Sequence, residues 1–113
     1  MTRTEALEKA ISAVADRERA YKAALERDAE AEYQFKIKQA QELLKAEGTE
    51  AVKKSIALVA CASEYKEHLS ATANKDFTKV ALIDAQSAMS ARQSLLTAES
   101  KSNFSYATSQ STI

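Results

Sequence analysis

The residue types that most often do chemistry are scarce in this sequence. It has a single cysteine, Cys61, a single histidine, His68, and no glycine-rich loop. Cys61 lies between alanines in an apolar stretch, where a free thiol usually behaves as a small core residue rather than as a nucleophile. His68 follows Glu64 by four residues, but one such pair supplies too few ligands for a metal site. We therefore expect no enzyme activity, no metal and no cofactor.

The charge balance excludes several classes of partner. The chain has 113 residues, with 16 basic and 16 acidic side chains and a formal net charge of zero. A dedicated DNA-coating protein would be strongly basic, and neutrality also argues against attraction to a membrane surface. No apolar run approaches the ~20 residues of a transmembrane helix, and the first ten residues lack the apolar core of a signal peptide. These features, with only one cysteine, predict a cytoplasmic location without a membrane partner.

The elements that must position these side chains are predicted to be long helices. There is one glycine and no proline in the chain, alanine makes up about a fifth of it, and glutamate, lysine, glutamine and leucine fill much of the rest. Within "AEGTEA", Lys45 and Gly48 are typical of a helix end, and Thr49 and Glu50 are typical of the next helix start. So short a connection favours antiparallel neighbours. The predicted fold is all-α, a long antiparallel helical hairpin that turns at Gly48.

The expected boundaries follow from capping signals and composition. The first helix should span about 4–46, because Thr2 and Glu5 have the spacing of a capping box. The second should span about 50–99, with a possible break near residue 74 in "SATANKDF", where serine, threonine and asparagine compete with the helical backbone. Residues 1–101 then form the hairpin. The Ser- and Thr-rich residues 102–113 are expected to be disordered unless a partner orders them.

A narrow apolar stripe predicts how the two helices pack. Glu18 and Asp28 interrupt the stripe of the first helix, which resumes with a shifted phase at Tyr33, Ile37, Ala40 and Leu44. Folding the chain symmetrically about Gly48 brings apolar residues together in the pairs Leu44–Val52, Ala40–Ile56, Ile37–Val59, Val14–Leu82 and Leu7–Met89. This predicts a coiled-coil-like seam. Two thin helices bury little surface, so we expect self-association as a dimer or larger oligomer, or helices supplied by another protein.

Six side chains are candidates for contacts with a partner. Phe35 is out of phase with the predicted seam, so it is expected to be exposed to another chain. Five lysines gather towards the turn, where they could touch phosphate groups: Lys36, Lys38, Lys45, Lys53 and Lys54. Acidic side chains concentrate at residues 26–32 and could meet a basic protein surface. The alternative, that all these charges form an ordinary solvated helix surface, stays open.

The stretch "YKAALERDAEAEYQFKIKQAQELLKAEGTEAVKKSIALV" resembles small helical proteins encoded in the early regions of tailed bacteriophages, often near recombination genes. In that pattern an alanine-rich helix ends in a Glu-Gly-Thr turn, here Glu47, Gly48 and Thr49, and resumes with paired basic residues, here Lys53 and Lys54. The resemblance covers roughly residues 18–96. It implies a cytoplasmic accessory role in a bacterial host and carries no catalytic residues.

Two functional hypotheses follow. The first is a non-enzymatic helical interaction protein, an accessory or regulatory factor of phage origin that acts through protein–protein contacts. The alternative is a nucleic-acid-binding accessory factor of recombination or replication that uses the lysines near the turn. Binding that weakens steeply with salt would distinguish the second from the first.

Overall fold

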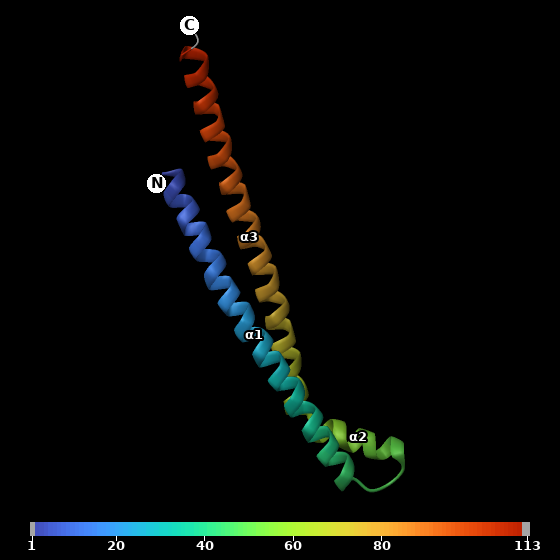
Figure 1. Ribbon diagram of the computed structural model, residues 1–113. Coiled ribbons are helices and arrows are strands. Elements are labelled where there is room, and N and C mark those ends of the chain that lie inside the picture. The colour runs from blue at the N-terminus through green and yellow to red at the C-terminus, as the bar shows by residue number, and fades with distance from the viewer. Residues whose placement is uncertain (1, 112–113) are drawn as a thin grey trace. The chain divides into compact units, whose positions relative to one another are not determined.

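The computed structural model describes the backbone of residues 2–111 and the side chains of residues 2–101. Its three helices are α1 (Arg3–Lys45), α2 (Glu50–Ala60) and α3 (Ala62–Ser111), and the described residues contain no strand (Figure 1). The prediction of an all-α fold is confirmed. The chain divides into two compact units. Unit 1 comprises Met1–Arg19 and Val80–Ile113, and unit 2 comprises Ala20–Lys79.

The first helix begins at the expected capping box. The backbone N–H of Glu5 donates to Oγ1 of Thr2 at 3.1 Å, and the backbone N–H of Thr2 donates to Oε2 of Glu5 at 3.4 Å. Two amides that the helix itself leaves free are therefore satisfied reciprocally.

The connection between α1 and α2 occupies residues 46–49. Gly48 has a φ of +118°, a backbone conformation that residues other than glycine rarely adopt. Thr49 is the N-cap of α2, with a φ of −70° and a ψ of 163°, and its hydroxyl oxygen accepts from the N–H of Val52 at 3.3 Å. The chain thus leaves one helix and starts the next within four residues.

The break expected near residue 74 lies instead at Cys61, between α2 and α3. Cys61 has a φ of −98° and a ψ of 9°, yet its N–H still donates to the Ala57 carbonyl, and its own carbonyl accepts from the Tyr65 N–H. α3 runs without interruption through Asn74 and on to Ser111, past the end expected near residue 99. The polar side chains near 74 do not break it: the Thr72 hydroxyl donates to Asp28 of α1, and the Thr78 hydroxyl donates to the Lys75 carbonyl within the continuous helix.

Within each unit, α1 and α3 run antiparallel and share a narrow seam (Figure 1). The buried and half-buried positions alternate by three and four residues. In unit 2 they include Tyr21, Ala24, Asp28, Ala31, Phe35, Lys38 and Glu42 on α1, Cys61 just before α3, and Glu64, His68, Ala71, Thr72, Lys75 and Thr78 on α3. In unit 1 they include Leu7, Ala10, Val14, Leu82, Ala85, Met89 and Leu96. The seam of unit 1 is therefore apolar, whereas that of unit 2 is about half polar.

The predicted phase of the second half of α1 is wrong at Tyr33, Ala40 and Leu44, which are exposed, whereas Ile37 is half-buried. Tyr33 and Leu44, assigned to the seam from the sequence, are 58% and 88% exposed. Phe35, expected to be exposed, is half-buried instead. The reason is that the spacing of seven continues without a shift through Tyr21, Asp28 and Phe35. Asp28 is itself a seam residue rather than an interruption.

The expected pairing next to the turn is also wrong. Leu44 and Val52 were expected to meet, as were Ile37 and Val59, but Leu44 and Val59 are 88% and 77% exposed. Figure 1 shows α2 at a steep angle to the C-terminal part of α1, so the two do not run side by side there. The bend at Cys61 returns the chain to α1 only where α3 begins. This leaves much of the apolar surface of α2 uncovered.

Candidate functional site

A polar cluster lies in the seam of unit 2, centred on Asp28. Asp28 as a whole residue is only 8% exposed, and it is the one charged or polar residue in the described part of the chain that is this deeply buried. Its Oδ1 accepts from the Thr72 hydroxyl at 2.6 Å, and its Oδ2 accepts from the Lys75 ammonium at 3.0 Å. Nε2 of His68 lies 3.8 Å from Oδ1. One side chain of α1 is thus held by two hydrogen-bond donors of α3, with the His68 ring nearby.

These contacts keep the Asp28 carboxylate charged. The Thr72 hydrogen bond, and after it the Lys75 hydrogen bond, lower the pKa of Asp28 below its ordinary value. The hydrogen bond between Lys75 and Asp28 also raises the pKa of Lys75. A carboxylate that has two direct donors and a low pKa is poorly suited to act as a general acid or base near neutral pH. The cluster is therefore built to join two helices in one register.

An aromatic group lies beside the cluster. The Phe35 ring is 5.3 Å from the Tyr65 ring, with the planes tilted by 49°, and 6.2 Å from the His68 imidazole, with the planes stacked at 23°. Both distances are typical of packed aromatic pairs. A fold symmetrical about Gly48 would set Phe35 opposite Cys61, so the observed pairing is displaced by about one helical turn. Phe35 serves the α1–α3 seam and is not the exposed contact residue that the sequence predicted.

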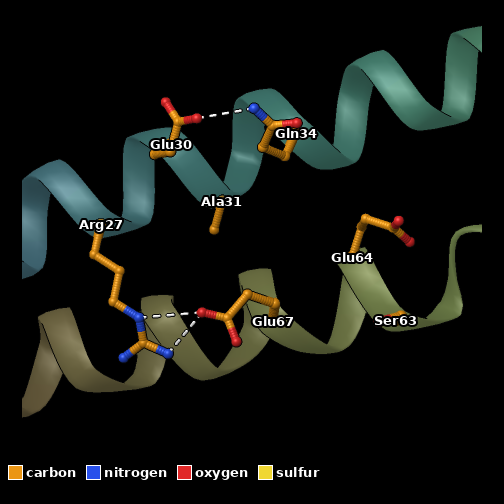
Figure 2. A pocket seen from close by; sticks show the side chains of 7 residues that line it. All are labelled: Arg27, Glu30, Ala31, Gln34, Ser63, Glu64 and Glu67. Carbon is orange, nitrogen blue, oxygen red and sulfur yellow. Dashed lines mark hydrogen bonds and ion pairs between the residues drawn. The ribbon is translucent and has the colours of Figure 1, made fainter.

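A cleft of about 360 Å³ opens between α1 and α3 in unit 2 (Figure 2). Its charged rim is largely paired: Arg27 donates to Glu67 at 2.8 Å, and Gln34 donates to Glu30 at 2.8 Å. Figure 2 shows the Glu64 carboxylate away from both pairs. Glu64 Oε2 is buried and has no hydrogen-bond partner. The cleft offers apolar contact and carboxylates, but no nucleophile paired with a base.

Cys61 is a core residue, as its sequence context indicated. Its side chain is 0% exposed. Burial, reinforced by the carboxylates of Glu64 and Glu42, raises the pKa of the thiol. A buried thiol with a raised pKa is a poor nucleophile.

Four of the five candidate lysines lie close to carboxylates. The ammonium groups are 2.8 to 3.9 Å from their acidic partners in the pairs Lys36–Glu32, Lys38–Glu42, Lys45–Glu42 and Lys54–Glu50. Lys38 is a seam residue whose pKa is raised, chiefly by its hydrogen bond to Glu42. The fifth, Lys53, is half-buried on α2. The structure thus does not gather these lysines into one uncompensated basic patch.

The apolar face of α2 is the feature that sequence reasoning missed. Val52, Ile56 and Val59 are 47%, 44% and 77% exposed. A shallow cavity of about 450 Å³ lies over this face, lined by Ser55, Ile56, Val59 and Ala60. The apolar spacing itself was visible in the sequence. It was assigned to the seam with α1, because nothing in "VACAS" marks the bend at Cys61.

Two kinds of site are absent from the part of the chain that the structure describes. No three His, Cys, Asp or Glu side chains there are arranged to hold a metal ion. None of the helices there contains a stretch long and apolar enough to cross a membrane.

Comparison with known proteins gives no family for this chain. No family model, no curated protein and no solved structure matches it. The resemblance to phage-encoded helical proteins therefore stays a hypothesis based on residues 18–96, and the function is argued from the side chains alone.

Proposed function

We propose that this protein is a non-enzymatic interaction protein. In this proposal α1 and α3 form a long coiled-coil-like hairpin that turns at Gly48, and its exposed apolar side chains bind other chains. The main observation in its favour is that, among residues 2–101, the fully buried side chains are small while many large apolar side chains are exposed. The largest side chain that is fully buried is that of Cys61. The exposed large apolar residues, by contrast, are Ile11, Leu25, Tyr33, Leu44, Val52, Ile56, Leu58, Val59, Tyr65, Leu69, Phe77, Val80, Ile83 and Leu95.

The chemistry of the polar cluster fits an interaction protein better than an enzyme. Asp28 is engaged by Thr72 and Lys75, and Cys61 is buried. Their side chains hold helices together rather than facing a substrate pocket. The further proposal, a cytoplasmic accessory role in a phage-infected bacterium, rests only on the resemblance of residues 18–96.

Nucleic-acid binding is the weaker proposal. The ion pairs of Lys36, Lys38, Lys45 and Lys54 reduce the positive charge available to phosphate groups. On this account Lys53→Glu together with Lys54→Glu changes the retardation of DNA at low salt by less than about twofold. A large loss of salt-sensitive binding would favour the nucleic-acid role instead.

Photo-cross-linking in cells that naturally make the protein tests the proposed function. A benzoylphenylalanine is placed at Phe77, which is 70% exposed on α3, and in a matched variant at Glu8, an exposed charged position of α1. The proposal predicts discrete heavier adducts from position 77 and few from position 8. Equal and diffuse labelling from both positions would contradict it.

A further inference from the structure

The cleft between α1 and α3 in unit 2 contains a carboxylate that the chain itself leaves unpaired. The cleft has a volume of about 360 Å³, and all of its lining residues lie within Ala20–Lys79. Glu64, in the first turn of α3, is half-buried, and its Oε2 is buried without a hydrogen-bond partner. Figure 2 shows this side chain in the space between the two helices. A buried carboxylate oxygen without a donor is unfavourable, so a ligand that supplies the donor is stabilised there.

The donors at the rim of the cleft are committed to other acceptors. Arg27 donates twice to Oε1 of Glu67, from Nε at 3.2 Å and from Nη2 at 2.8 Å. The side-chain amide of Gln34 donates to Glu30 at 2.8 Å. Arg27 is the only cation among the described residues that line the cleft. The lining therefore has no positive charge left for Glu64.

Lys38, a seam residue of α1, is also engaged elsewhere. Its ammonium group lies 3.1 Å from Oε1 of Glu42. The hydrogen bond to Glu42, and to a lesser extent the charge of Glu64, raise the pKa of Lys38. Lys38 is thus close enough to sense the charge of Glu64, but it donates to Glu42. The position of a cation that contacts Glu64 directly is open.

The cleft combines surplus negative charge with apolar surface. Its lining has three carboxylates, those of Glu30, Glu64 and Glu67, and one guanidinium, so three negative charges and one positive charge leave a formal charge of −2. Glu64 and Glu67 are three residues apart and are neighbours on one face of α3, where like charges repel. Most of the remaining surface of the cleft is apolar and includes Ala31, which is only 7% exposed. Such a site suits a positive charge at the end of an aliphatic stem.

We propose that this cleft binds the cationic end of a basic side chain, lysine or arginine, from a partner protein. The ammonium or guanidinium group donates to the Glu64 carboxylate, and the aliphatic stem packs on the apolar surface beside Ala31. This site deepens the proposed function, on which it rests, by naming where a partner is held and which chemistry the partner presents.

A metal ion suits the cleft less well than an organic cation. Glu30 and Glu67 already accept hydrogen bonds, so Glu64 is the one lining carboxylate that is free, whereas Ca²⁺ takes about six to eight oxygen ligands. A bare ion also gains nothing from apolar surface. An alkylammonium or alkylguanidinium group supplies donors for Glu64 and carbon atoms for the surface beside it.

Titration of the isotope-labelled full chain with small basic probes tests the chemistry of the site. The probes are butylammonium and butylguanidinium, and 1-pentanol is the neutral control of similar size, all at constant ionic strength. In carbon-detected NMR, both cations should shift the side-chain carboxyl signal of Glu64. Pentanol at the same concentration should shift it at least about fivefold less, because it brings no charge to the carboxylate.

Two glutamine variants make the titration specific. Glu64→Gln and Glu26→Gln each remove one negative charge from unit 2, but Glu26 is exposed and does not line the cleft. Read from the backbone amide of Ala31, Glu64→Gln should raise the dissociation constant of butylammonium at least about fivefold, and Glu26→Gln by less than about 1.5-fold. Circular dichroism should show that both variants keep the helicity of the wild type.

Cross-linking in cells tests whether the cation comes from a partner protein. The heavier adducts formed from benzoylphenylalanine at position 77 should decrease at least about threefold in Glu64→Gln and persist in Glu26→Gln. A Glu64 signal that ignores both cations, or equal dissociation constants for the two variants, would overturn the site. Cation binding with adducts that Glu64→Gln leaves unchanged would instead assign the cleft to a free organic amine and overturn the partner side chain.

These failures are distinct from a failure of the proposed function. Adducts from position 77 without any response of Glu64 to the cations would support an interaction protein and contradict the cation site. A responsive Glu64 with equal and diffuse labelling from positions 77 and 8 would retain the cation chemistry of the cleft, but it would contradict both the partner side chain and the proposed function.

Discussion

The hydroxyl of Thr72 donates a 2.6 Å hydrogen bond to Oδ1 of Asp28, joining α3 to α1 inside the seam of unit 2. Lys75 holds the second oxygen of the same carboxylate at 3.0 Å. A carboxylate in a thin helical seam is costly unless it is paired, so its partners must lie opposite it. The observed alignment of the two helices places both partners within hydrogen-bonding distance of Asp28. The main effect of these hydrogen bonds is therefore to fix the register of α3 against α1.

The Asp28 contact predicts how stability depends on pH. Its hydrogen bonds to Thr72 and Lys75 lower the pKa of Asp28 from its ordinary value of 3.8. The stability it contributes is therefore fully present above about pH 4, and is lost as the pH falls through the lowered folded-state pKa. Urea midpoints measured from pH 7 to pH 3 should fall for the wild type.

Two variants make the pH test specific. Asp28→Asn removes the charge that faces Lys75, so the variant should be less stable than the wild type at pH 7 and lose less stability on acidification. Asp84→Asn, at an exposed position of α3, is the control and should retain the wild-type slope. Identical slopes for wild type and Asp28→Asn would show that the cluster does not contribute to stability.

Two aromatic residues test the phase of α1. Phe35 packs 5.3 Å from Tyr65, whereas Tyr33 is 58% exposed. Phe35→Ala is expected to lower the free energy of unfolding by about 2 kcal/mol, because it removes a ring from a seam of small residues. Tyr33→Ala should change it by less than about 0.5 kcal/mol. Chemical denaturation of both variants measures these two losses of unfolding free energy. A larger loss for Tyr33→Ala than for Phe35→Ala would support the helix phase that the sequence predicts.

Gly48 tests the connection between α1 and α2. Its φ of +118° disfavours any L side chain, and a β-carbon there would lie 3.1 Å from Cγ1 of Val52. Gly48→Ala should cost about 1–2 kcal/mol in the closed turn and favour continuous helix. Helicity should stay constant or rise, while a domain-swapped dimer increases the hydrodynamic radius. Adding Val52→Ala relieves the contact but not the backbone strain, so it should restore stability only partly. If Val52→Ala restored the stability of Gly48→Ala fully, the whole loss would come from the contact of the added β-carbon with Val52 and none from backbone strain.

Much of the fold could be predicted from local signals. The capping box at Thr2 and Glu5 and the glycine-then-threonine sequence at Gly48 and Thr49 act within a few residues. Their geometry therefore depends little on the rest of the chain. The absence of proline and the abundance of strong helix formers predict the all-α class, because helix propensity also acts locally.

The seam of unit 2 was missed because the residue that belongs there is charged. From the sequence, the charge of Asp28 predicts an interruption of the apolar stripe, and this puts Phe35 out of phase. Its partners Thr72 and Lys75 are more than 40 positions away, so no local pattern shows that its charge is compensated. Allowing one paired polar residue in the repeat of seven would have placed Phe35 correctly.

The bend at Cys61 leaves no signal in the sequence. No glycine or proline lies near it, and backbone hydrogen bonds continue on both sides, from Cys61 to Ala57 and from Tyr65 to Cys61. The exposed face of α2 follows from this bend. It could not be identified as a candidate surface before the direction of α2 was known.

Sedimentation equilibrium of the full chain from about 1 to 200 μM most directly tests whether the exposed apolar surface binds other chains. If other chains of this protein bind that surface, the mass should rise with concentration from 12.3 kDa towards twice that value. The rise should be equal at low and high salt. A mass of 12.3 kDa at every concentration, with no partner cross-linked from Phe77, would contradict the account.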